Sequence, residues 1–340
     1  AKGDWVGGPM YYIKNGLGPR WKWVGTVFCA FAAIACFGIG NMSQVNSIVG
    51  SLNDAIDVFN PAAAGERATL NLVFGILIAA LVALILFGGI KRIGAVAEKL
   101  VPAMSVLYIV FALVVIFGHA DNIGPAFGKI FSTAFTPGAI GGAAAGIALK
   151  QTIVWGLRRS AFSNEAGLGS AAIAHAAAET PGPVQQGIYG IFEVFADTIV
   201  ICTLTALTII CSGVEIPFGT YVNSELISGA FATVFGAKFA SVFVALALVL
   251  FAFTTVLGWA LYGSRCAQYL FGLKFAKVYQ AAFIVVIVVG AIAKLDVVWN
   301  IADTFNGLMA IPNFFALFAL SGVVVKLTKD HFFADKSKLK

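Results

Sequence analysis

Residues 149–183, LKQTIVWGLRRSAFSNEAGLGSAAIAHAAAETPGP, interrupt a long apolar region with charged side chains, an amide and closely spaced glycines. An apolar segment precedes the interruption, and a segment rich in small residues follows it. In a bilayer, backbone that leaves a helix is tolerated only where it is buried in protein or lines a water-filled cavity. The sequence therefore predicts a broken membrane helix here, and this stretch is the first candidate for a binding site.

The composition is that of a membrane protein. Of the 340 residues, 60% are hydrophobic and only 11% are charged, whereas about 25% are charged in an ordinary soluble domain. The net charge of +6 comes from basic residues in short loops between apolar runs, a pattern typical of membrane topology and not of a nucleic-acid partner. Five cysteines without a CxxC pair and three histidines offer little material for a metal centre or histidine catalysis, so no cofactor is expected.

Runs of about twenty apolar residues, the length that crosses a bilayer, predict a single all-α polytopic transmembrane domain with eight spans. The spans are expected at 24–52, 70–90, 101–118, 142–178, 187–211, 240–262, 278–293 and 297–327. Pro312 removes a backbone donor from the last of them and is expected to bend or split it.

Basic residues are concentrated in alternate loops, and most acidic loop residues lie in the opposite set. The basic loops all fall on one side of the membrane if the segment 142–178 crosses the bilayer once. The basic loops and the C-terminal tail are then expected on the cytoplasmic side of the cell membrane.

Ionisable groups inside spans are costly and are functional candidates by default. Arg158 and Arg159 either bind an anionic substrate or, as their place in the cytoplasmic half favours, reach the interface or pair with a carboxylate. Glu193 and Asp197, four residues apart, share one helix face and either carry protons or hold the broken segment. Asp303, in the last span, likewise has either a functional or a structural role.

Neutral polar residues give a second signal. Gln44, one turn beyond Asn41, points an amide into the bundle or lies at the interface. Adjacent hydroxyls at Thr254 and Thr255 usually bond back to the preceding helical turn; the alternative is that they supply oxygen ligands to a small cation. Trp259, one turn further, walls an apolar pocket or belongs to ordinary packing.

Two enzyme-like patterns carry less weight. The GLGSAA run at 167–172 resembles a nucleotide-binding fingerprint but lacks the preceding strand that such a site needs. Ser170 and His175 do not share a helix face, and no GxSxG elbow is present. An intramembrane enzyme that uses Glu193 and Asp197 remains the alternative from another class, and a channel is disfavoured because no span has a continuous polar face.

Four segments resemble the alanine/glycine:cation symporter family, also called sodium:alanine symporters. They are GGPMYYIKNGLG at 7–18, FGIGNMSQVNSI at 37–48, SAFSNEAGLGSAAIAHAAAETPGPVQQG at 160–187 and AFTTVLGW at 252–259. The resemblance implies a LeuT-type fold of two inverted repeats, in which the first helix of each repeat is broken at the substrate site. Members carry two spans before the first of these motifs, so the chain is expected to be an N-terminally truncated member that lacks the first two core helices.

The implied function is sodium-coupled symport of alanine and glycine by alternating access, with Na⁺ as the co-transported ion and no enzymatic activity. Proton coupling remains open because carboxylates lie within the spans. The resemblance assigns substrate binding to Gln44, Phe162, Asn164, Gly167 and Trp259, and sodium binding to Thr254 and Thr255. One departure is the run GWALYGSRC at 258–266, where the family shows a second aromatic and an acid.

Overall fold

A computed structural model describes residues 5–135, 143–217, 224–293 and 295–333. Within these ranges every regular element is a helix, and none is a strand. In the described part of the chain, six helical stretches are long and apolar enough to cross a membrane, or up to seven if one bent pair counts as a span. The fold is therefore that of a polytopic membrane protein. The helix α8 (Ala143–Asn164), which belongs to the expected broken span, is not among those stretches.

The first half of the chain begins with short turns and then forms long helices. The short elements are α1 (Pro9–Tyr12), η1 (Ile13–Leu17) and η2 (Pro19–Trp21). One continuous helical stretch follows, made of α2 (Lys22–Phe37), the π-helical η3 (Gly38–Met42) and α3 (Ser43–Phe59). Next come η4 (Pro61–Glu66), α4 (Arg67–Leu86), α5 (Gly89–Gly118), η5 (Ala120–Asn122) and α6 (Ile123–Phe135).

The second half contains the interrupted segment. After α8 come α9 (Ala171–His175), α10 (Pro183–Val194), the π-helical η6 (Phe195–Cys202), α11 (Thr203–Ser212) and α12 (Glu225–Phe235). The last helices are α13 (Ala237–Phe271), α14 (Leu273–Ile292), α15 (Leu295–Ala319) and α16 (Ser321–Phe333).

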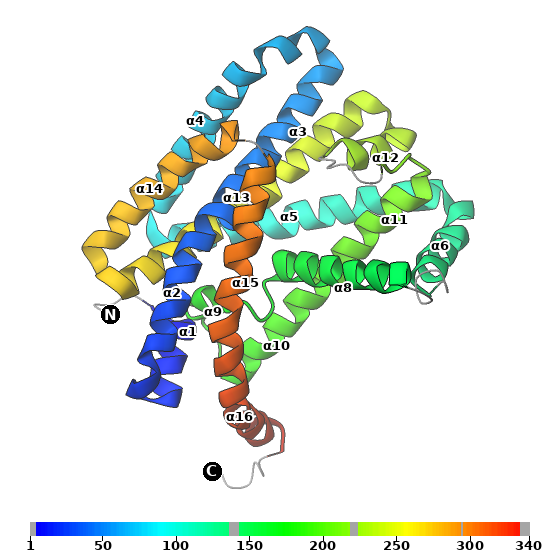
Figure 1. The fold of residues 1–340 in the computed structure, drawn as a ribbon. Coiled ribbons are helices and arrows are strands. Elements are labelled where there is room, and N and C mark those ends of the chain that lie inside the picture. Colours follow the sequence, from blue (N-terminus) through cyan, green and yellow to red (C-terminus); the bar gives the residue numbers. More distant parts are fainter. Residues whose placement is uncertain (1–4, 136–142, 218–223, 294, 334–340) are drawn as a thin grey trace.

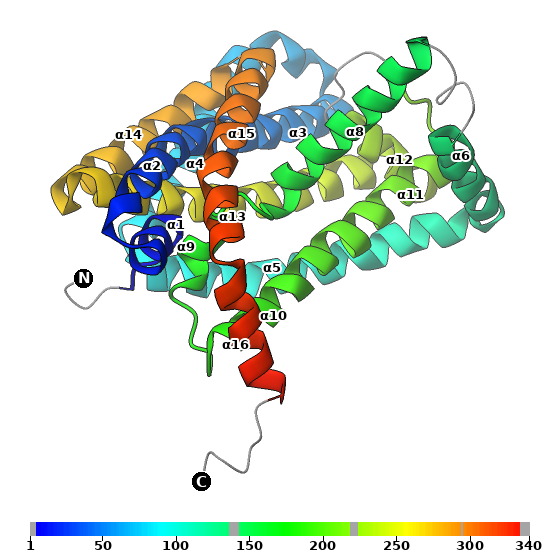
Figure 2. The same ribbon diagram turned by 60° about the horizontal axis from the view of Figure 1, so that its bottom comes forward.

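Helix α13 lies between two groups of helices. It packs against α2, α3 and α14 on one side and against α5 and α12 on the other, and both views show it running through the middle of the bundle (Figures 1 and 2). Helix α14 packs on α4, and α15 packs on α2. The core that joins these helices includes the fully buried rings of Phe28, Trp259 and Phe283.

Close helix crossings depend on small residues. A Cβ at Gly38 would lie 3.0 Å from the Cα of Ala302, and one at Gly290 would lie 2.7 Å from the Cα of Met42. Glycine at such crossings lets backbones approach closely, as is common between membrane helices. Large apolar side chains cover outward faces instead, among them Leu84, Val106 and Phe117. Apolar surface of this extent is expected of helices that face lipid.

The last span is not split at Pro312. Helix α15 continues through this residue and ends at Ala319. The axis then bends by 56° across the break between Ala302–Ala319 and Ser321–Phe333. One missing backbone donor is tolerated inside a membrane helix, so the helix is interrupted at Leu320 and not at Pro312.

Candidate functional site

The expected broken span is interrupted between α8 and α9. Helix α8 ends at Asn164, and α9 begins at Ala171. Between them, φ is +56° at Glu165, +80° at Gly167 and +91° at Gly169. Glycine adopts positive φ at little cost because it has no Cβ, so the two glycines allow the chain to leave the helix and start a new one. We call residues 165–170 the break.

Side chains bind several polar groups of the break. The Nδ2 of Asn313, on α15, donates to the carbonyl oxygen of Gly167 at 2.8 Å. The hydroxyl of Tyr12 donates in turn to Oδ1 of Asn313. Within the break, Ser170 Oγ donates to Oε2 of Glu165 at 2.6 Å. The motif at 7–18 thus lies beside the break, where a Cβ on Gly169 would meet Cγ of Pro9 at 2.6 Å.

A cavity of about 1040 Å³ opens beside the end of α8. Its walls come from helices that are far apart in the sequence, among them α3, α5, α8, α10, η6 and α13. Most of the site residues that the family resemblance assigns line it: Gln44, Phe162, Asn164, Thr254, Thr255 and Trp259. Gly167 is the exception, since it is not among the described residues that line the cavity; its carbonyl faces Asn313 instead.

One wall of the cavity joins α8 to the π-helical η6. Ser163 Oγ donates to Oδ2 of Asp197 at 2.5 Å, and Asn164 Nδ2 donates to Oγ1 of Thr198 at 2.8 Å. Asp197 thus contacts the broken segment, which agrees with the structural one of its two interpretations. The π-helical geometry of residues 195–202 is rare and is often found at functional sites.

Glu193 lies one turn before Asp197 and also lines the cavity. Its Oε2 is 3.3 Å from Nε2 of His175, on α9. Both carboxylates therefore contact the broken segment, one on each side of the break. His175 pairs with Glu193 and not with Ser170, whose hydroxyl is bonded to Glu165. Ser170 and His175 therefore do not form a nucleophile and its base.

Another part of the cavity lining comes from α13. The hydroxyls of Thr254 and Thr255 donate to the carbonyl oxygen of Phe251 at 2.9 and 3.0 Å, which is the back-bonding expected of helical threonines. Each hydroxyl oxygen keeps lone pairs with which to accept a bond or coordinate a cation. Trp259 is 2% exposed, and its side chain packs directly on Gly40, where a Cβ would lie 2.0 Å from the Cβ of Trp259.

The remaining residues singled out in the sequence make other contacts in this region. The amide of Gln44 donates to the carbonyl oxygen of Ile39 at 3.1 Å. The ring of Phe162 packs on Trp299 with a centroid distance of 4.9 Å. Arg159 forms an ion pair with Asp303 on α15, so these two ionisable residues pair with each other. Arg158 is exposed and lies 5.7 Å from the Trp155 ring.

Sequence reasoning missed several cavity residues. Tyr108 on α5 lines the cavity and shares a hydrogen bond of 2.7 Å with Oγ1 of Thr205 on α11. Ser163 and Tyr262 line it as well. Tyr108 could have been found, because a hydroxyl in the middle of an apolar span is a polar group that needs a partner.

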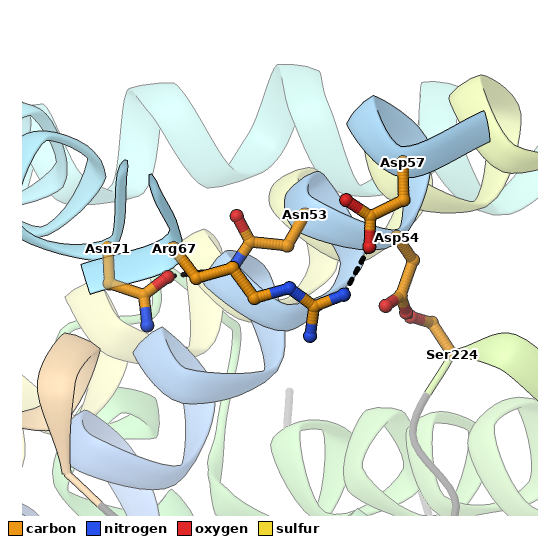
Figure 3. A network of polar contacts seen from close by, with 6 residues as sticks. All are labelled: Asn53, Asp54, Asp57, Arg67, Asn71 and Ser224. Atoms are coloured by element: carbon orange, nitrogen blue, oxygen red, sulfur yellow. Dashed lines mark hydrogen bonds and ion pairs between the residues drawn. The ribbon is translucent and has the colours of Figure 1, made fainter. Parts of the chain in front are cut away.

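A second polar network joins the ends of α3, α4 and α12, away from the break (Figure 3). Ser224 Oγ, at the start of α12, donates to Oδ2 of Asp54 at 2.5 Å. Arg67 forms an ion pair with Asp57, and Asn53 Nδ2 donates to Oδ1 of Asn71 at 2.7 Å. The network ties α12, which lies in the connection between α11 and α13, to the C-terminal end of α3.

No group of three or more His, Cys, Asp or Glu residues is arranged to hold a metal ion within the described ranges. Oxygen atoms of hydroxyls, amides and single carboxylates are the cation ligands that this cavity offers. Such ligands suit small hard cations and not transition metals.

Comparison with known proteins identifies relatives along the whole chain. A family model described as the sodium:alanine symporter family matches residues 1–340. The chain is 43% identical to the sodium/alanine symporter AgcS of Methanococcus maripaludis over 96% of its own length and 69% of the relative's. An uncharacterized transporter of Haemophilus influenzae is 40% identical, over 97% of this chain and 70% of the relative. The amino-acid carrier protein AlsT of Bacillus subtilis is 36% identical, over 96% and 66%.

Proposed function

Because the chain belongs to the sodium:alanine symporter family, we propose that it carries a small neutral amino acid, alanine or glycine, across the cell membrane together with Na⁺. It is a multi-pass membrane transporter and not an enzyme, and its family is defined by sodium-coupled symport.

The observation that carries the proposal is the convergence of the assigned residues on one cavity beside a broken helix. Gln44, Phe162, Thr254 and Trp259 come from three different helices, and all line the same space. In transporters built from inverted repeats, substrate and ions bind where helices are broken, because freed backbone groups and helix ends face the ligand there.

We propose that the cavity holds a small zwitterion. The rings of Phe162 and Trp259 give it apolar surface for a methyl group, and we propose that they exclude larger side chains by overlap. Polar groups at Ser163, Asn164 and Thr255 also line the cavity and are available to the charged ends of the amino acid and to a cation. We propose that Thr254 and Thr255 bind Na⁺ through their hydroxyl oxygens.

We propose that coupling rests on shared occupancy of the cavity. If Na⁺ raises the affinity of the cavity for the amino acid, the amino acid raises its affinity for Na⁺ by the same factor. Symport further requires that the empty protein and the fully loaded protein are the states that change access. We propose that the bundle does so in a LeuT-type alternating-access cycle, with the break as one of its hinges and the basic loops on the cytoplasmic side.

Proton coupling is the second candidate, and the carboxylates of Glu193 and Asp197 in the cavity lining favour it. Uptake of radiolabelled alanine into proteoliposomes separates the two. An inward sodium gradient should drive accumulation, and replacing external Na⁺ by choline should abolish it. Equal uptake in the two media would overturn sodium coupling, whereas accumulation driven by a pH gradient in choline would support protons.

A further inference from the structure

The side chain of Arg159 is flanked by aromatic rings on α8 and α15. Its guanidinium carbon lies 4.7 Å from the ring centroid of Trp299, 5.3 Å from that of Phe162 and 5.5 Å from that of Trp155. These distances are within the range of cation–π attraction. The planar guanidinium is thus held among three rings, and it does not extend along the helix surface as a snorkelling side chain does.

The charge of Arg159 is balanced by Asp303. One terminal nitrogen of the guanidinium is 3.0 Å from Oδ1 and 2.8 Å from Oδ2 of the carboxylate. The two residues are 144 positions apart in the sequence, so the ion pair fastens α8 directly to α15. Removing either partner would leave a partly buried charge without compensation.

Phe162 connects this arrangement to the cavity. It lies three residues after Arg159 and therefore on the same face of α8. Its ring packs on Trp299 at 4.9 Å and lines the cavity. Neither Arg159 nor Asp303 is among the described residues that line the cavity, and the charge of Arg159 is already paired, which disfavours a direct contact with the carboxylate of an amino acid.

We propose that Arg159 and Asp303 are positioning residues that fix the Phe162 ring in the cavity wall and thereby set the largest amino-acid side chain that the cavity accepts. The proposal rests on the proposed function, since it requires that the transported amino acid occupies this cavity. The ion pair holds Arg159, the guanidinium and Trp299 hold the phenyl ring, and the ring limits the space.

The test compares two amino acids in each variant. Arg159→Lys keeps the positive charge but loses the planar surface that stacks on rings, and Asp303→Asn keeps the shape but loses the charge. Arg158→Lys is the matched control, since Arg158 is the neighbouring exposed residue and forms no ion pair in the described part of the chain. Sodium-dependent uptake of alanine and of leucine is measured in proteoliposomes, and KM and the maximal rate are determined separately.

We expect Arg159→Lys and Asp303→Asn to raise the ratio of leucine to alanine uptake efficiency about tenfold, the effect of one or two methylene groups in an apolar pocket. Most of the change should fall on the KM for leucine. Phe162→Leu should produce a similar shift, and adding Arg159→Lys to Phe162→Leu should change the ratio no further. A merely structural role predicts equal losses for both amino acids and additive effects, and either result would overturn the proposal.

Near-UV circular dichroism gives a readout that needs no transport, because it reports the fixed packing of aromatic rings. The difference between the wild-type spectrum and that of Trp299→Phe defines the contribution of Trp299. That contribution should shrink in Arg159→Lys and Asp303→Asn and persist in Arg158→Lys. An unchanged spectrum in both would overturn the positioning role even if the protein transported no amino acid, whereas absent transport by the wild type would overturn only the proposed function.

Discussion

Asn313 supplies the backbone of Gly167 with the hydrogen bond that the broken helix lost. The Nδ2 to carbonyl oxygen distance is 2.8 Å, and Asn313 is only 2% exposed. Its own Oδ1 accepts a bond from the hydroxyl of Tyr12, so the amide is used at both ends. Asp303, on the same helix, binds Arg159 on α8, before the break. Helix α15 therefore holds the broken span both within the break and in the helix that precedes it.

Replacing Asn313 by alanine should destabilise the protein by about 1–3 kcal/mol, because a partly buried carbonyl would lose its partner. Asn313→Asp should fail to restore stability, since a carboxylate cannot donate to Gly167. The measurement is the thermal unfolding midpoint of the detergent-purified protein. Tyr12→Phe should cost less alone and little more when added to Asn313→Ala, because the two residues act through one amide. Additive losses of stability in the double variant would contradict the series of hydrogen bonds from Tyr12 through Asn313 to Gly167.

The sequence predicted the class of fold because hydropathy marks the apolar part of each span, but it did not predict helix ends. Helix α5 begins at Gly89 and includes Lys91, Arg92 and Lys99, which the sequence placed in a loop. Helix α13 likewise runs past the expected end at 262 to Phe271. Helices can extend beyond the bilayer, and charged residues with good helix propensity continue them. Hydropathy alone therefore cannot distinguish the end of the apolar stretch from the end of the helix.

Gly40→Ala should impair alanine uptake strongly. The new Cβ would lie 2.0 Å from both Cβ and Cγ of Trp259, so the indole would have to leave its place in the cavity wall. Overpacking of this kind usually costs about 1–3 kcal/mol, and a KM for alanine at least about tenfold higher is expected. Uptake kinetics in proteoliposomes give this value.

Gly307→Ala is the control for that substitution. Its Cβ would meet no atom within 4 Å in the described part of the chain, and alanine is favoured over glycine in a helix. Uptake should remain at the wild-type level. If Gly40→Ala and Gly307→Ala behaved alike, the contact between Gly40 and Trp259 would not shape the cavity.

Thr254→Val and Thr255→Val should each raise the sodium concentration needed for half-maximal uptake, by about tenfold, equivalent to about 1.4 kcal/mol of lost binding. Valine keeps the branched shape and removes the oxygen. Thr254→Ser and Thr255→Ser should restore sodium dependence, because serine keeps the hydroxyl. The measurement is alanine uptake over a series of sodium concentrations at constant ionic strength.

Thr328→Val tests whether losing a helical back-bond alone has this effect. Thr328, on α16, donates to the carbonyl oxygen of Val324 at 2.9 Å, the same local bond that Thr255 makes. It should leave the sodium dependence unchanged. A shift as large as that of Thr255→Val would mean that the threonines of α13 act through helix geometry and not through a cation.

The candidate site was predicted from a resemblance, since spacing alone does not bring its residues together. Gln44, Phe162 and Thr254 lie on different helices, and only the packing of those helices gives them a common cavity. The pairing of Arg159 with Asp303 was also beyond sequence reasoning, because several carboxylates were available within the spans. Gly167 was assigned to substrate binding as part of a motif, whereas the structure places its carbonyl against Asn313. Which backbone groups of a break face a ligand depends on its local dihedral angles.

Asp54 and Ser224 provide the last prediction, because they join α12 to the end of α3 (Figure 3). The hydrogen bond of 2.5 Å is partly buried, and Ser224 is 7% exposed. Asp54→Ala should therefore speed hydrogen–deuterium exchange of the backbone amides at 225–235 without unfolding the bundle, since local opening depends on such contacts.

The neighbouring pair Arg67–Asp57 is more exposed, with 50% and 27% of the side-chain areas accessible, and pairs of this kind contribute about 0–1 kcal/mol. Asp57→Ala should leave the exchange of α12 unchanged, and equal acceleration in the two variants would show that neither contact fastens α12 specifically.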